Sequence, residues 1–129
     1  MKAITLYQPW ASLVSIGAKT IETKSWSTRY RGPLAIHAAK KAVPVDDPYY
    51  RSVLASAGLA YDELPQGVIV ATCSLVDCRV ITSENCPCYP EYAFGDFKPG
   101  WYAWKLTDIK RIHDPLPSRG HRGLWDLKI

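Results

Sequence analysis

Apolar and polar residues alternate in several short stretches of the chain, as they do in strands that bury one face. The pattern predicts strands at residues 3–7, 20–26, 34–39, 68–81, 101–112 and 123–127. The stretch 68–81 is the longest and is expected to bend within the sheet. Residues 82–99 contain Asn, Gly, Cys and three Pro, so we expect a loop there.

Two short segments have the spacing of helices instead. The segment from Pro9 to Gly17 places its apolar residues on one helical face, and proline and glycine suit the two ends of such a helix. Asp47 is suited to cap a second helix that begins with Pro48 and ends near Gly58.

Five or six strands with two or three short helices predict an α+β fold. The exposed edges of so small a sheet are best removed by closing it into a small β-barrel. The length of 129 residues fits a single domain over residues 1–129, and an apolar content of 47% suffices for a core. A charged content of 22% is too low for a disordered chain.

No apolar run approaches the roughly 20 residues that cross a bilayer, and the first residues lack the apolar stretch of a signal peptide. We therefore expect a cytoplasmic chain without membrane contact, and the sequence indicates no obligate protein partner. In that compartment the cysteines are expected to be reduced thiols; they are Cys73, Cys78, Cys86 and Cys88. Their spacing does not match a zinc site. We expect no metal and no cofactor.

The net charge of +4 is unevenly distributed along the chain. Residues 1–41 contain seven Lys or Arg and one acidic residue, residues 42–104 contain three and eight, and residues 105–129 contain six and three. Basic ends around an acidic middle predict a positive face that would favour phosphates or other anions. The alternative is a solvated surface with a chance imbalance.

The segment 17–26 carries the most informative polar residues. Glu22, Lys24 and Trp26 fall on one face of the predicted strand, with Lys19 within reach at the junction of helix and strand. A partly desolvated Lys–Glu pair can transfer protons or stabilise an oxyanion. The alternative is a surface salt bridge beside a buried tryptophan, because exposed ion pairs without a function are common.

Aromatic side chains close to basic residues suggest contacts with nucleobases and phosphates. Trp10 and Trp26 are the candidates for stacking on a base, whereas Trp101, Trp104 and Trp125 are expected in the core.

Three further residues complete the candidate binding set. Arg31 lies in a basic turn, and Lys40 follows the strand predicted at 34–39. His37 alternates with the apolar residues of that strand and points away from them, either to line a pocket or to face solvent.

Together these residues resemble the ASCH domain, a branch of the PUA-like superfamily. The similar motifs span nearly the whole chain and are Gln8-Pro9-Trp10-Ala11, Gly17-x-Lys19-Thr20-x-Glu22-x-Lys24-x-Trp26, Tyr30-Arg31-Gly32-Pro33, Ile36-His37-Ala38-Ala39-Lys40 and Pro115-Leu116-Pro117-x-x-Gly120-x-x-Gly123-Leu124-Trp125. The resemblance implies a PUA-like β-barrel with a cleft beside the first helix, and a role in RNA binding or processing.

Some small bacterial ASCH proteins are amidohydrolases that remove the acyl group from N4-acetylcytidine, and the resemblance implies this class of reaction. In those enzymes a Lys and a Thr three residues later act with a Glu from a distant segment. Lys19 matches the lysine, but Glu22 stands at the threonine position. Lys19 would then stabilise the oxyanion or protonate the leaving amine, and Glu22 would activate a water. The distant acid would be Glu84 or Glu91.

The substrate on this hypothesis is a modified nucleoside or nucleotide of the N4-acylcytidine type, bound without a metal or cofactor. The residues expected to bind it are Trp10, Lys24, Trp26, Arg31, His37 and Lys40. A non-catalytic RNA-binding module that uses the same positive face is the alternative. A ribonuclease with His37 and Lys19 as acid and base is a third hypothesis.

Overall fold

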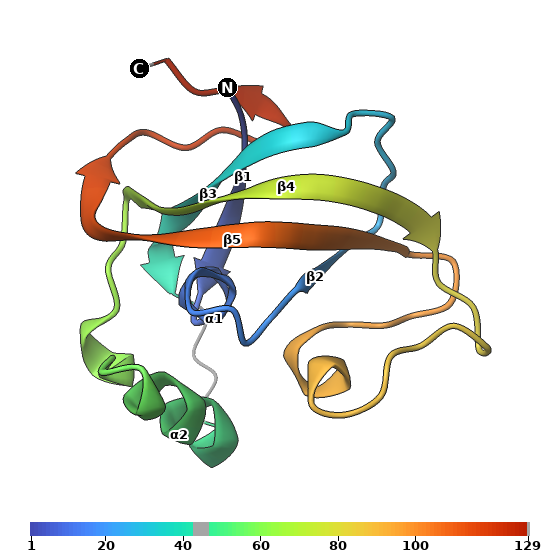
Figure 1. Ribbon diagram of the computed structural model, residues 1–129, viewed down its shortest axis with the longest axis horizontal. Helices are drawn as coiled ribbons and strands as arrows, with labels where there is room; N and C mark the ends of the chain where they lie inside the picture. The colour runs from blue at the N-terminus through green and yellow to red at the C-terminus, as the bar shows by residue number, and fades with distance from the viewer. Residues whose placement is uncertain (43–46, 129) are drawn as a thin grey trace.

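The computed structural model describes residues 1–42 and 47–128, which form one mixed sheet with helices at one end (Figure 1). The strands are β1 (Lys2–Gln8), β2 (Ile21–Lys24), β3 (Gly32–Ala42), β4 (Val68–Val80), β5 (Tyr102–Pro117) and β6 (Trp125–Asp126). The helices are α1 (Trp10–Ser15) and α2 (Pro48–Ser56), with 3₁₀ turns η1 (Tyr61–Glu63) and η2 (Glu91–Phe94). The predicted α+β class and the six predicted strands are confirmed.

The strands follow the order β2-β5-β4-β3-β1-β6 across the sheet. β1 and β3 run parallel, and the other neighbours are antiparallel. Within the described residues the hydrogen-bonded ladder ends at β2 and β6, so the sheet stays open instead of closing into the expected barrel. The edge strands are too short to close it, because β2 has four residues and β6 has two.

A side-chain bridge fixes α1 to the end of β1. The Gln8 carboxamide accepts a hydrogen bond from the Ser12 backbone N–H at 3.0 Å, and it donates to the Ser12 hydroxyl at 2.8 Å and the Pro65 carbonyl at 2.7 Å. These bonds satisfy a donor at the start of α1 that would otherwise be unpaired in the interior. The second helix begins as predicted, because the Asp47 carboxylate accepts from the Tyr49 backbone N–H at 2.9 Å.

The main core lies between the sheet and α1. Apolar side chains of five strands or helices meet there, including Ile4, Ala11, Val14, Leu34, Ile36, Leu75, Trp104 and Leu106. Trp104 is completely buried and Trp125 is buried in a smaller cluster beside β1, as predicted, whereas Trp101 is only half-buried.

A second cluster joins α1, α2 and η2. It consists of Leu13, Tyr50, Leu54 and Phe94, all of them buried. Residues 82–99 were predicted as a loop, and they run as one apart from η2, whose Phe94 side chain is inserted against the helices. This anchor holds the turn over the start of β2 and so brings Glu91 close to the segment 17–26.

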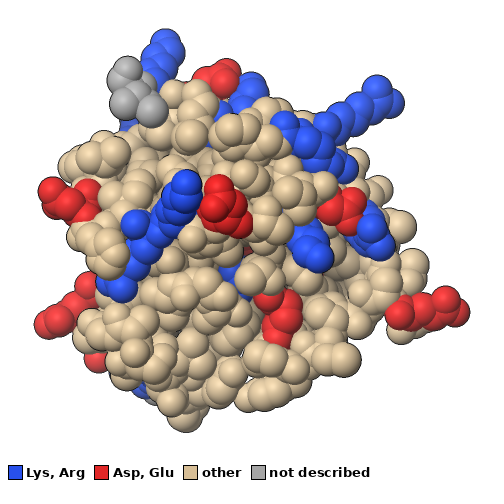
Figure 2. Space-filling model, in the orientation of Figure 1, with Lys and Arg blue, Asp and Glu red and all other residues tan. Residues whose placement is uncertain are grey.

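The face of the molecule shown in Figure 2 carries both basic and acidic side chains. Basic and acidic side chains are interspersed over the face that presents β4 and β5, without a large area of one sign. The uneven distribution along the chain therefore does not make this face positive. No helix in the described parts of the chain is long and apolar enough to cross a membrane.

The buried position of Phe94 generates a stability prediction. Phe94→Ala should lower the free energy of unfolding by about 3–5 kcal/mol, because it removes a large buried side chain and leaves a cavity. Urea denaturation would measure the loss. Leu116→Ala is the control, because Leu116 is 52% exposed and should change stability little. An equal loss in both variants would contradict an anchoring role for Phe94.

Candidate functional site

Two adjoining cavities lie along β1, β3 and the segment that follows β5. The first has a volume of about 520 Å³ and is lined by Thr5, His37, Ala39, Lys40, Arg119, Gly120, His121 and Arg122. The second has a volume of about 360 Å³ and is lined by Thr5, Tyr7, Lys24, Trp26, Ala39, His121, Arg122 and Gly123. We call them the His37 pocket and the Trp26 pocket, and together the basic groove. No Asp or Glu is among these lining residues.

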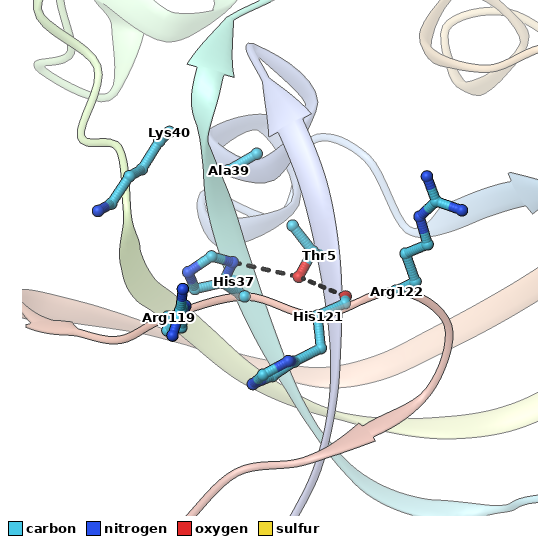
Figure 3. A pocket seen from close by; sticks show the side chains of 8 residues that line it. Thr5, His37, Ala39, Lys40, Arg119, His121 and Arg122 are labelled. Carbon is cyan, nitrogen blue, oxygen red and sulfur yellow. Dashed lines mark hydrogen bonds between the residues drawn. The ribbon is translucent and has the colours of Figure 1, made fainter.

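The register of the parallel strands creates the floor of the groove. Thr5 of β1 is paired with His37 of β3, so their side chains emerge side by side. The Thr5 hydroxyl lies 3.2 Å from His37 Nδ1 and 3.3 Å from the His121 carbonyl oxygen, as the dashed lines in Figure 3 show. Trp125 of β6 donates its indole N–H to the same hydroxyl at 3.1 Å. The residues between β5 and β6 are thereby fastened across the two strands.

His37 is a neutral structural link in this floor. Its Nε2 lies 2.7 Å from the Ser118 carbonyl oxygen, which can only accept, so Nε2 carries the hydrogen. Burial lowers the pKa of His37 below its usual 6.5; the Ser118 carbonyl opposes this shift, and the nearby His121 adds to it. With Nε2 donating, Nδ1 can only accept, so the single hydrogen of the Thr5 hydroxyl is shared between Nδ1 and the His121 carbonyl oxygen.

The segment passes over His37 at a distance that only glycine permits. A Cβ on Gly120 would lie 2.6 Å from His37 Cε1 and 2.9 Å from the Thr5 hydroxyl oxygen. Since real Cβ atoms do not approach other atoms so closely, Gly120 allows Arg119 and Arg122 to be displayed directly above the floor. In the view of Figure 3, Lys40 and Arg119 flank His37, and Arg122 lies beyond Thr5 on the opposite side.

Trp26 and Lys24 reach the groove from the other end. Trp26 is 36% exposed. Its ring meets that of the buried Trp104 edge to face, with centroids 4.8 Å apart and an interplanar angle of 82°. The Trp104 indole N–H also donates to the Trp26 carbonyl oxygen at 3.3 Å. These two contacts fix the orientation of the exposed ring, which faces the same cavity as Tyr7.

Lys19 lies between α1 and β2 and is completely buried. Its ammonium donates to the Ile21 carbonyl at 2.6 Å and the Phe94 carbonyl at 2.8 Å, and it lies 3.5 Å from Glu22 Oε1. Burial lowers the pKa of Lys19, although the nearby carboxylates of Glu22 and Glu91 oppose that shift. The structure therefore encloses the predicted catalytic lysine and places it outside both cavities.

Two acidic residues surround the buried ammonium. Glu22 is also buried, and its second oxygen lies 3.7 Å from Lys24 Nζ, so it links Lys19 with a residue that lines the groove. Glu91 accepts from the Thr20 backbone N–H at 2.8 Å and from the Thr20 hydroxyl at 2.6 Å. Its other oxygen is buried and has no hydrogen-bond partner among the described residues. Of the two distant candidates, Glu91 thus lies beside the motif, whereas Glu84 is exposed in the loop.

The remaining predicted residues are divided between the groove and other parts of the fold. His37, Lys40, Lys24 and Trp26 line the groove. Trp10 instead packs at the edge of the cluster around Leu13 and Phe94.

Arg31 is engaged with its own turn. Its guanidinium donates to the Thr28 and Tyr30 carbonyls, both at 2.9 Å, and Arg31 is absent from the lining of either cavity.

Sequence reasoning missed five polar or aromatic residues of the groove, namely Thr5, Tyr7, Arg119, His121 and Arg122. The run Arg119-Gly120-His121-Arg122-Gly123 was a usable signal, because three basic or imidazole side chains are interspersed with two glycines in a connecting segment. In the described residues no group of three or more His, Cys, Asp or Glu could hold a metal ion. The four cysteines are free thiols.

The hydrogen bonds of His37 generate a prediction for NMR spectroscopy. We expect the ring to titrate below pH 6.5 and, when neutral, to carry its hydrogen on Nε2. Because the folded-state pKa is depressed, His37 contributes stability that is present above about pH 6.5 and lost as the pH falls through the folded-state pKa. Long-range ¹⁵N–¹H spectra across this range would report both properties, with His37→Gln used to assign the signal. A hydrogen on Nδ1, or a pKa above 6.5, would contradict the proposed linkage.

Comparisons with known proteins identify the family of the chain. The ASCH domain family model matches residues 4–115. The human protein named activating signal cointegrator 1 is 35% identical over 129 residues, which cover 96% of this chain and 22% of the human protein. The mouse protein of the same name is 32% identical over 80 residues, covering 58% of this chain and 14% of the mouse protein. The chain thus spans about a fifth of the human relative, and it belongs to the ASCH domain family.

Proposed function

We propose that this chain binds single-stranded RNA along the basic groove, with a base stacked in the Trp26 pocket and the backbone following the basic residues. The observation that carries the proposal is the composition of the groove. Two exposed aromatic rings, Tyr7 and Trp26, share it with four basic side chains, and no carboxylate of the described residues lines it. Aromatic faces stack on bases of any sequence, while Lys and Arg neutralise phosphates, as in other single-strand binding proteins.

The groove is held rigidly by its neighbours, and a rigid groove binds a ligand more favourably than a mobile surface does. Trp26 is oriented by Trp104, and the segment carrying Arg119 and Arg122 is fastened to Thr5 and His37. A preformed site of this kind loses less conformational entropy when its ligand binds. RNA is favoured over DNA by the family, since ASCH domains are often RNA-binding.

Substitutions in the groove should separate stacking from charge. Trp26→Ala should weaken binding of a fluorescein-labelled oligouridine about 5- to 100-fold, the range expected for the loss of one stacked base. Arg122→Gln should reduce the salt dependence, lowering the slope of log K against log salt by about 0.7 if one phosphate contact is lost. Fluorescence anisotropy at several salt concentrations measures both effects.

Lys110→Gln is the matched control, because it removes one positive charge from β5 outside the groove. It should leave affinity and slope nearly unchanged. Equal weakening by Lys110→Gln and Arg122→Gln would contradict a localised groove, and failure of the wild-type protein to bind at low salt would exclude the proposal.

Hydrolysis of N4-acylated cytidine is a second candidate function, favoured by one observation. Glu22 joins the buried Lys19 to Lys24 at the Trp26 pocket, and the unpaired oxygen of Glu91 lies in the same buried region. The Lys19 ammonium is enclosed by the Phe94 carbonyl, so chemistry there requires the η2 turn to move away. The ribonuclease hypothesis lacks such support, because His37 lines a cavity that Lys19 does not.

This second function has its own test. Wild-type protein should convert N4-acetylcytidine to cytidine, followed by ultraviolet absorbance, and Glu22→Gln should abolish the conversion while preserving the shape of the side chain. Lys19→Met should also abolish it, but that variant leaves buried carboxylates uncompensated and must first be shown to fold. Lys110→Gln should remain active. No conversion by the wild type, or full conversion by Glu22→Gln, would remove this function.

A further inference from the structure

The His37 pocket gathers an excess of positive charge. Lys40, Arg119 and Arg122 all line it and are all exposed, and none of them forms an ion pair with a carboxylate in the described residues. Basic residues elsewhere on the surface are often neutralised by an aspartate, as in the pairs Lys2–Asp126, Arg79–Asp77, Lys98–Asp96 and Lys110–Asp108. The cations of the His37 pocket are therefore available to an anionic ligand.

Three cations exceed what one internal phosphate of an RNA strand requires. A phosphodiester has a single negative charge, whereas a phosphate monoester carries about −1.5 to −2 at pH 7 and offers three acceptor oxygens. Arg presents a planar fork that donates two parallel hydrogen bonds to phosphate. Two arginines and a lysine around one cavity thus match a monoester better than a diester.

We propose that the His37 pocket binds the terminal phosphate monoester of an RNA strand whose adjacent base is stacked in the Trp26 pocket. The inference rests on the proposed RNA binding and adds that the protein recognises a phosphorylated strand end. Arg122 supports this arrangement, because it lines both cavities and so joins the base subsite directly to the phosphate subsite.

His37 acts here as a positioning residue. Both of its ring nitrogens are engaged, with Ser118 and Thr5, so it holds the segment 118–123 in place and contributes no further donor to the phosphate. The close approach of Gly120 to the ring allows no side chain to fill the space between the cations. The pocket is therefore preorganised, and Lys40, Arg119 and Arg122 are the Lys and Arg side chains among the described residues that line it.

The test compares four oligouridine hexamers that differ only at their ends. They carry a 5′-phosphate, a 3′-phosphate, a methyl ester of the preferred terminal phosphate, or hydroxyls at both ends. One of the two monoesters should bind about tenfold more tightly than the hydroxyl form, as expected for added hydrogen bonds between charged groups. The methyl ester, which has a single charge, should lose most of that gain.

Variants then assign the gain to the pocket. Arg119→Gln and Lys40→Gln should abolish the tenfold difference between the monoester and the hydroxyl form. The ratio of these two affinities is the readout, because both residues also belong to the groove that the strand follows. Trp26→Ala should weaken all four hexamers by a similar factor, and Lys110→Gln should have no effect. A gain that persists in Arg119→Gln, or that is equal for the methyl ester, would overturn the terminal-phosphate proposal.

Its failure can be distinguished from failure of the proposed function. Equal, groove-dependent binding of all four hexamers would refute end recognition while supporting RNA binding. No binding of any hexamer would refute both. Uridine 5′-monophosphate is the remaining comparison, and if it bound as tightly as the phosphorylated hexamer, the ligand would be a free nucleotide and the strand-end proposal would be wrong.

Discussion

The groove depends on one contact between neighbouring parallel strands, the pairing of Thr5 with His37. Through it the Thr5 hydroxyl meets His37, the His121 carbonyl and the Trp125 indole, while His37 also bonds the Ser118 carbonyl. Four segments of the chain are therefore joined at one partly buried polar centre. His37 is buried and would be costly to leave unpaired, so the network holds the connection between β5 and β6 in place.

Lys19 is a second polar centre, and it has a different role in the structure. A buried ammonium is tolerated only where carbonyls and carboxylates surround it, and here Ile21, Phe94 and Glu22 do so. Because Phe94 is itself anchored between α1 and α2, the ion pair connects the helical layer to the edge strand β2. The family motif around Lys19 is thus a structural support in this conformation. Lys24, which pairs with Glu22 and lines the Trp26 pocket, connects that motif to the groove.

Most strands and helices of the fold could be predicted from the sequence, because alternation of apolar residues determines which stretches can bury one face. It also indicated the α2 cap at Asp47 and the buried position of Trp104. It did not indicate the burial of Lys19 or the distance of Trp10 and Arg31 from the groove, since these depend on how η2 and the 28–31 turn pack. Arg119 and Arg122 were missed because a connecting segment has no periodicity, and only its bonds to β1 and β3 place it.

The two polar centres explain why binding and hydrolysis make different demands on the same fold. Binding uses the groove as it stands, because Trp26, Arg122 and Lys40 are already exposed around one cavity system. Hydrolysis needs Lys19 to exchange its bond with the Phe94 carbonyl for contact with a substrate, and this would disturb the cluster of Leu13, Tyr50, Leu54 and Phe94. Displacing a packed aromatic side chain costs several times the thermal energy. The closed arrangement consequently supports the proposed RNA binding more than the proposed hydrolysis, and in it Lys19 is an internal support.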